Sequence, residues 1–280
     1  MTALPADIVE LSPAVEPATR QRRGVPQLVA HQVKFDLLSL VRNGQARFFT
    51  IAMPVGFLLL FCAIFGNGSI KADGESVRAS TYYVANLTTF GIVDAACMSL
   101  AIALVDARET GIIRRRQATP QPSWIIVVGR AVTTILIATV TGVVLLAIGR
   151  LAFGASTPLA GLPSLAASVV IGSTAFCCIG FALTGFIRSI QSAQPVVMAA
   201  TMPLFFISGV FIPWAIIPQW LQHVAAIFPI RHLSLAILAP FVSHGGHGTW
   251  SRDDLLVLVA WGVGGLALAL RSFKWAPQDT

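Results

Sequence analysis

The stretch FFTIAMPVGFLLLFCAIFG, residues 48–66, decides the class of this protein. It runs for 19 residues without a charged side chain, and a helix needs roughly 20 mostly apolar residues to cross a bilayer. The whole chain shares this bias, because 55% of its 280 residues are hydrophobic and only 11% are charged, against about 45–50% and about 25% in soluble domains. The composition predicts an integral membrane protein and excludes a soluble enzyme, a secreted disulfide scaffold and a disordered chain.

Working outward from this stretch, the intervals of low charge predict an all-α polytopic protein. The interval Ser189–Ile230 has no Asp, Glu, Lys or Arg over 42 residues, about twice the length of one crossing, and five prolines interrupt it. It therefore makes either two crossings or one crossing followed by a re-entrant segment. The preferred six spans lie at about 48–66, 82–105, 124–148, 164–187, 194–213 and 255–271.

The positive charges favour six spans over seven. With six spans and a cytoplasmic N-terminus, 14 of the 19 Lys and Arg residues lie on the cytoplasmic side, as membrane insertion favours. A seventh span would move Arg271 and Lys274 outside. We therefore expect both termini in the cytoplasm and an extracellular re-entrant helical hairpin after the fifth span, containing Ser208, Gly209, Phe211, Pro213, Pro218, Trp220 and Pro229.

The region before the first span divides into two parts. Residues 1–25 contain acids and prolines where a signal peptide would be apolar, which predicts a disordered cytoplasmic tail. In residues 26–46, apolar side chains recur at helical spacing between polar ones, which predicts an amphipathic helix in the cytoplasmic interface. A six-span domain would then occupy residues 47–273, followed by a cytoplasmic tail at 274–280.

The loop DARETGIIRRRQATPQPSW, residues 106–124, is the most informative polar stretch. The positive-inside rule accounts for its three consecutive arginines, which could also meet anionic lipid. It does not account for Glu109 and Gly111, because topology needs no acid there.

This loop, with Glu-x-Gly, arginines, Ala-Thr-Pro and then Gly129-Arg130, resembles the cytoplasmic loop of type-2 ATP-binding-cassette exporter permeases, which include daunorubicin-resistance-type membrane subunits. The segment SGVFIPWAIIPQWLQHVAAIFPIRHL, residues 208–233, resembles the family's Ser-Gly-x-Phe-x-Pro stretch and Leu-Pro-x-Trp-Leu turn. Ile217 replaces the leucine, and residues 230–232 read Ile-Arg-His instead of the more usual Leu-Thr-Tyr. The resemblance covers the chain from about Gln27.

The resemblance implies a permease subunit that is driven by a separate ATPase. None of the three lysines follows a glycine, so the sequence lacks the phosphate-binding loop of an ATPase. No catalytic residue is expected, and ATP and magnesium would bind to the partner. The family implies two cytoplasmic ATPase copies and a second permease protomer, identical or paralogous. The expected ATPase-coupling residues are Arg108, Glu109, Thr110, Gly111, Arg114, Arg115 and Arg116.

Two features are candidates for a substrate path. An acid inside a span costs about 2.5–3.5 kcal/mol on insertion scales, so Asp94 either lines the path or makes a hydrogen-bonded contact between helices. A stripe of Met and Phe side chains in the fifth span could line an adaptable hydrophobic path, or be ordinary packing. The candidate path residues are Phe90, Asp94, Met198, Met202, Phe205 and Phe206.

The expected function is export of an amphipathic drug, antibiotic or lipid-like molecule from the cytoplasm or inner leaflet across the plasma membrane. Membrane lipids are expected partners and nucleic acid is not. The glycine-rich segment with His244 and His247 lacks the three or four ligands that zinc requires, so no metal site is expected. The alternatives are a non-transporting scaffold or sensor subunit and an ion-coupled secondary transporter, which usually has several intramembrane ionisable residues.

Overall fold

The computed structural model describes residues 24–65, 68–72, 75–111, 124–156, 161–242 and 250–272. Within these ranges the chain is mostly helical, and six helices are long and apolar enough to cross a membrane, which agrees with the predicted fold class. They are Phe48–Phe65, Ala79–Glu109, Val128–Phe153, Leu162–Thr184, Ile190–Ile207 and Arg252–Arg271. Outside the described residues lie 1–23 of the predicted N-terminal tail, the predicted C-terminal tail, Arg114, Arg115, Arg116 and the two histidines of the glycine-rich segment. The predicted N-terminal tail ends one residue too late, because Val25 already belongs to a helix.

The elements follow one another in a simple order. The first half comprises α1 (Val25–Arg42), α2 (Gly44–Arg47), the π-helix η1 (Phe48–Ala52), α3 (Met53–Phe65), β1 (Ser69–Ala72), β2 (Glu75–Arg78), α4 (Ala79–Val93), the π-helix η2 (Asp94–Ser99) and α5 (Leu100–Glu109). The second half comprises α7 (Trp124–Phe153), α8 (Leu162–Thr184), α9 (Ile190–Ile207), the 3-10 helix η3 (Trp214–Ile216), α10 (Gln219–Ala225), α11 (Pro229–Val242) and α12 (Arg252–Ser272).

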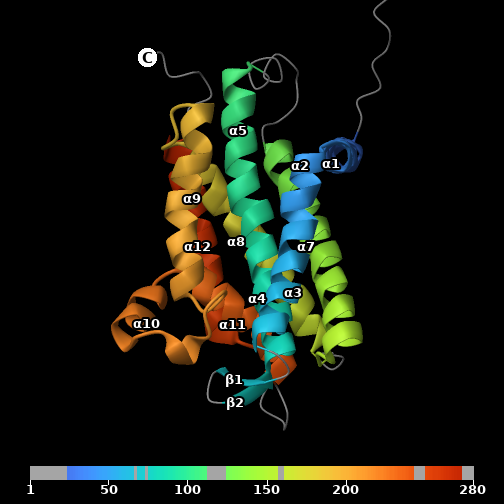
Figure 1. The fold of residues 1–280 in the computed structure, drawn as a ribbon. Coiled ribbons are helices and arrows are strands. Elements are labelled where there is room, and N and C mark those ends of the chain that lie inside the picture. The colour runs from blue at the N-terminus through green and yellow to red at the C-terminus, as the bar shows by residue number, and fades with distance from the viewer. Residues whose placement is uncertain are drawn as a thin grey trace, which may run out of the picture.

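The long helices form a bundle whose two ends differ (Figure 1). One end carries α1, which lies crosswise to the spans, together with the last turns of α5. The other end carries the β-hairpin and α10. This arrangement matches the predicted order of loops, in which these two groups lie on opposite sides of the bundle.

The second span is the central element of the bundle. Every residue of α4 is buried, and the continuous helix from Ala79 to Glu109 has 31 residues, about 46 Å at 1.5 Å per residue. That length exceeds a hydrocarbon core of about 30 Å. The helix ends at Glu109, four residues beyond the predicted end at residue 105, and this added turn contains Arg108 and Glu109.

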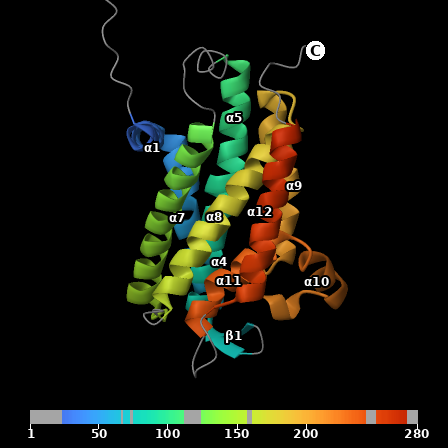
Figure 2. The ribbon, with the colours of Figure 1, turned by 180° about the vertical axis from the view of Figure 1, so that it is seen from behind.

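Close packing of α8 against α12, visible from behind in Figure 2, depends on glycine. A Cβ atom on Gly265 would lie 3.0 Å from the backbone nitrogen of Ile179, and one on Gly262 would lie 3.1 Å from Cα of Ala175. A side chain at either position would meet backbone, which cannot move aside cheaply. These two glycines let the helix backbones approach closely, as small residues do in membrane helix pairs.

The connections contain two features that the sequence did not predict in detail. Residues Ser69–Ala72 and Glu75–Arg78 pair as an antiparallel hairpin, with Ser69 opposite Arg78. The fifth span, α9, ends at Ile207, six residues before the expected boundary. Helices α10 and α11 follow it, with a bend of 92° between them.

Candidate functional site

Arg108 binds the connection between α8 and α9. Its side chain is only 3% exposed, and its guanidinium donates hydrogen bonds to the carbonyl oxygens of Thr184 (3.3 Å), Ile187 (2.5 Å) and Arg188 (3.3 Å). The last carbonyls of a helix have no partners within the helix, and they carry partial negative charge. Arg108 therefore caps the end of α8 from the neighbouring helix α5.

Glu109 binds the other side of the same connection. Its Oε1 atom accepts a hydrogen bond of 2.8 Å from the backbone nitrogen of Ile190, the first residue of α9. A carboxylate is favourable there because the first backbone N–H groups of a helix are unpaired and partly positive. Together, Arg108 and Glu109 attach the last turn of α5 to the end of α8 and to the beginning of α9. We call these two residues and the turn at residues 185–189 the clasp.

The next two residues end α5. Thr110 donates from Oγ1 to the carbonyl of Asp106 (2.8 Å), and Gly111 has a φ of +70°, the left-handed conformation that favours glycine after a helix. Thr110 is exposed, as is the Glu109 residue as a whole, whereas Arg108 is turned inward. Of the predicted coupling residues that the structure describes, Arg108 and Glu109 therefore lie together in the clasp. Thr110 lies at the surface beside it.

The sequence did not predict that the turn between α8 and α9 lies beside the end of α5. Within it, Phe186 is 62% exposed and Arg188 is exposed, while Ile187 is buried. The sequence signal for this turn is only local, because Ser189 and Ser192 form a capping box that marks the beginning of α9.

Two predicted path residues, Phe90 and Phe205, belong to an aromatic cluster that also contains Tyr83, Phe211 and the partly buried Phe57 and Phe61. The rings of Phe90 and Phe205 lie 5.0 Å apart, and both residues are almost fully buried within one protomer. Phe206 is half exposed at the edge, 5.4 Å from the ring of Phe211. Met198 and Met202 are partly buried and pack against the hydrophobic core.

Asp94 lies one turn after Phe90, at the point where α4 becomes the π-helix η2. Its Oδ2 atom is buried and has no hydrogen-bond partner among the described residues. A buried polar atom without a partner costs free energy, and such positions in membrane helices mark functional sites more often than other positions do.

At the opposite end of the bundle, polar side chains join α4 to the turn after α9 and to α11. The Tyr82 hydroxyl donates to the carbonyl of Gly209, which has a φ of +85°. The guanidinium of Arg231 lies 3.6 Å from the ring centre of Trp214, and Ser234 donates to Asn86 (2.5 Å). Of the predicted hairpin residues, Ser208, Gly209, Phe211, Pro213 and Pro229 are buried, whereas Pro218 and Trp220 are exposed.

Comparison with known proteins gives consistent results. The family described as "ABC-2 type transporter" matches residues 28–241 of the chain. A protein named "Probable multidrug ABC transporter permease YbhR" from Escherichia coli (strain K12) is 30% identical over 152 residues, covering 54% of this chain and 40% of the relative. The chain thus spans less than half the length of that relative.

A second relative is covered almost completely. The "Putative transport permease YvfS" of Bacillus subtilis (strain 168) is 23% identical over 231 residues, which are 81% of this chain and 89% of the relative. The family match begins within α1 and ends within α11, so it includes the clasp and most of the spans. This multi-pass membrane protein belongs to the ABC-2 type transporter family.

Proposed function

We propose that this chain is the membrane-spanning permease subunit of an ATP-binding-cassette exporter, and that it moves an amphipathic molecule out of the cytoplasm or the inner leaflet. Family membership and the names of the relatives support a transport role. The name of the Escherichia coli relative includes "multidrug", which supports a drug as the substrate.

The clasp is the observation that carries the proposed mechanism. A separate ATPase subunit docks on the loop that follows Gly111, with the three arginines and the exposed end of α5 as its contacts. When ATP binding moves this loop, α5 moves with it. Because Arg108 and Glu109 attach α5 to both sides of the α8–α9 connection, the displacement reaches α9 without a flexible step.

The assembly contains two permease protomers, identical or paralogous, and two ATPase subunits that bind ATP and magnesium. Both termini are cytoplasmic, α1 lies in the cytoplasmic interface, and α10 with α11 forms a re-entrant hairpin on the extracellular side of the plasma membrane. The substrate path runs between the protomers near Asp94 and the half-exposed Phe206. Pairing of two protomers supplies walls that six helices alone do not provide.

Reconstitution tests this proposal. The permease and its ATPase, co-purified and placed in proteoliposomes, should accumulate an amphipathic dye on the extracellular side only when ATP is supplied on the ATPase side. An intact complex that hydrolyses ATP but moves no dye or lipid would favour a scaffold or sensor subunit. Movement driven by an ion gradient in the absence of ATP would instead identify a secondary transporter.

A further inference from the structure

Helix α1 lies at the level where a span begins. Asp36 of α1 accepts a hydrogen bond from Thr133 (3.5 Å) and lies 3.6 Å from Nε of Arg130. Both partners belong to the second and third turns of α7, whose 30 residues span about 45 Å and so extend beyond a hydrocarbon core of about 30 Å. In a bilayer, the end of such a helix is near the lipid headgroups, so α1 is held at headgroup depth.

One flank of α1 forms a shallow, open apolar groove of about 880 Å³, with Val132 of α7 at its edge. Its position at headgroup depth leaves the groove facing the boundary between headgroups and acyl chains. An apolar surface of this kind is costly to expose to water. The residues that line it include Val29, Val33, Lys34, Leu37 and Val41 of α1 and Val132 of α7.

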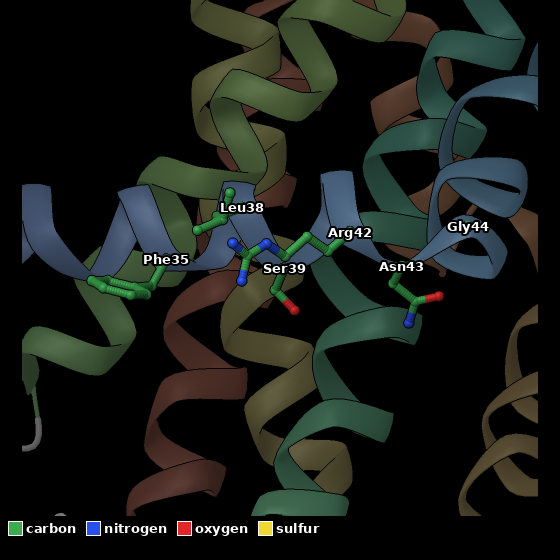
Figure 3. Close-up of a pocket in the computed structure, with 6 residues that line it drawn as sticks. All are labelled: Phe35, Leu38, Ser39, Arg42, Asn43 and Gly44. Atoms are coloured by element: carbon green, nitrogen blue, oxygen red, sulfur yellow. The ribbon is translucent and has the colours of Figure 1, made fainter.

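A second hollow of about 620 Å³ adjoins the groove where α1 ends, and Leu38 lines both (Figure 3). Its remaining lining residues are Phe35, Ser39, Arg42, Asn43 and Gly44. In Figure 3 the guanidinium of Arg42 runs back along α1 toward Leu38. A cation, a hydroxyl and an amide are therefore gathered beside an apolar surface.

The positive charge at this surface is not compensated within the part of the chain that the structure describes. Lys34 and Arg42 are exposed, and neither forms an ion pair with a described residue. Asp36 is the only acid in α1, and it is engaged by Arg130. A ligand that fits both hollows must therefore be apolar along its length and negatively charged at one end.

We propose that this surface, formed by α1, the start of α7 and Gly44, binds an anionic phospholipid. The acyl chains lie in the apolar groove, and the phosphate accepts charge-assisted hydrogen bonds from Arg42 and Lys34. This site is independent of the substrate path and of the clasp, because none of its lining residues belongs to either. Lipid bound there holds α1 and α7 together at the membrane boundary.

Lipid binding to the purified full-length chain tests the proposal. Native mass spectrometry during titration gives apparent dissociation constants for phosphatidylglycerol and for phosphatidylcholine. The double variant Lys34→Gln/Arg42→Gln should raise the apparent dissociation constant for phosphatidylglycerol about tenfold and leave phosphatidylcholine unaffected. The matched control is Lys71→Gln/Arg252→Gln, which removes two exposed cations at the opposite end of the bundle and should change either constant less than twofold.

Three results would overturn the proposal. The first is equal phosphatidylglycerol affinity in the wild type and in the Lys34/Arg42 variant, provided that both unfold at the same temperature. The second is glycerol phosphate competing as strongly as the intact lipid, which would identify a phosphate site without a lipid. The third is phosphatidylglycerol binding only after Asp7, Glu10 and Glu16 are replaced by amides, which would show that the acidic N-terminal segment occupies this surface.

Discussion

The guanidinium of Arg108 donates a hydrogen bond of 2.5 Å to the backbone carbonyl of Ile187, 79 residues further along the chain. Through this bond the last turn of α5 is attached to the connection between α8 and α9. The bond is buried, so water cannot compete with it readily. It joins the neighbouring ends of α5, α8 and α9 into one mechanical unit, on which the proposed coupling to an ATPase depends.

Replacing Arg108 with Met should destabilise the protein by about 3 kcal/mol, because three carbonyl oxygens would lose a charged donor in a buried place. Thermal unfolding of the purified chain in detergent measures the change. Arg188→Met is the control, since that side chain is exposed and its loss should change stability by less than about 0.5 kcal/mol. Equal unfolding temperatures for the wild type and Arg108→Met would contradict the assigned role.

Glu109→Ala should uncouple ATP hydrolysis from dye transport, because it removes the bond to the backbone of Ile190. Glu109→Gln retains an acceptor oxygen at the same position and should transport better than the Ala variant. The measurement is the ratio of dye molecules moved to ATP hydrolysed in proteoliposomes, with co-purification of the ATPase as the assembly control. If both variants keep the wild-type ratio, Glu109 does not transmit the movement.

Gly209→Ala should destabilise the protein by about 1–2 kcal/mol from backbone strain alone, because an L-residue is forced to a φ of +85°. Crowding adds to this cost, since the new Cβ would lie 3.2 Å from Nη1 of Arg231 and 3.3 Å from the Tyr82 hydroxyl. Gly111→Ala isolates the strain, because Gly111 has a φ of +70° and open space around its Cβ position. The unfolding temperature should fall further for Gly209→Ala than for Gly111→Ala.

Gly265→Val should separate α8 from α12, because a side chain there meets the backbone of Cys178 and Ile179 within 3.2 Å. The neighbouring Gly264→Val is the control, since nothing lies within 4 Å of its Cβ position. Unfolding temperature and the yield of monodisperse protein should fall for Gly265→Val only. Equal losses in both variants would show that valine lowers helix stability at either position, and that packing against α8 is not the cause.

Asp94→Asn should reduce ATP-driven export of a cationic amphipathic dye and leave a neutral dye largely unaffected. The substitution keeps the side-chain shape and removes the charge that the buried carboxylate can carry. Yield and co-purification of the ATPase should be unchanged. Wild-type export of the cationic dye by this variant would show that Asp94 does not contact the substrate.

The sequence by itself determined which segments are apolar enough to enter a membrane, and it predicted which loops share a side. Transfer into a bilayer depends on the composition of each segment and on the charges next to it, and both can be read locally. The loop at residues 106–124 was identified in the same way, because Glu109 was an acid that topology did not require. Its role toward an ATPase stays a prediction.

Only the tertiary structure decided where the side chains at the start of that loop, residues 106–111, and along the described spans point. Arg108 is one charge among many in a basic loop, and its partners lie 76 to 80 residues away, so no local pattern reveals that it faces inward. No local pattern reveals the contact between Phe211 and Phe90 either, because it forms only when the turn after α9 folds back onto α4. The four-residue strands of the β-hairpin are too short for a periodic signal. Contacts between distant segments depend on how the helices pack, and packing is a property of the whole bundle.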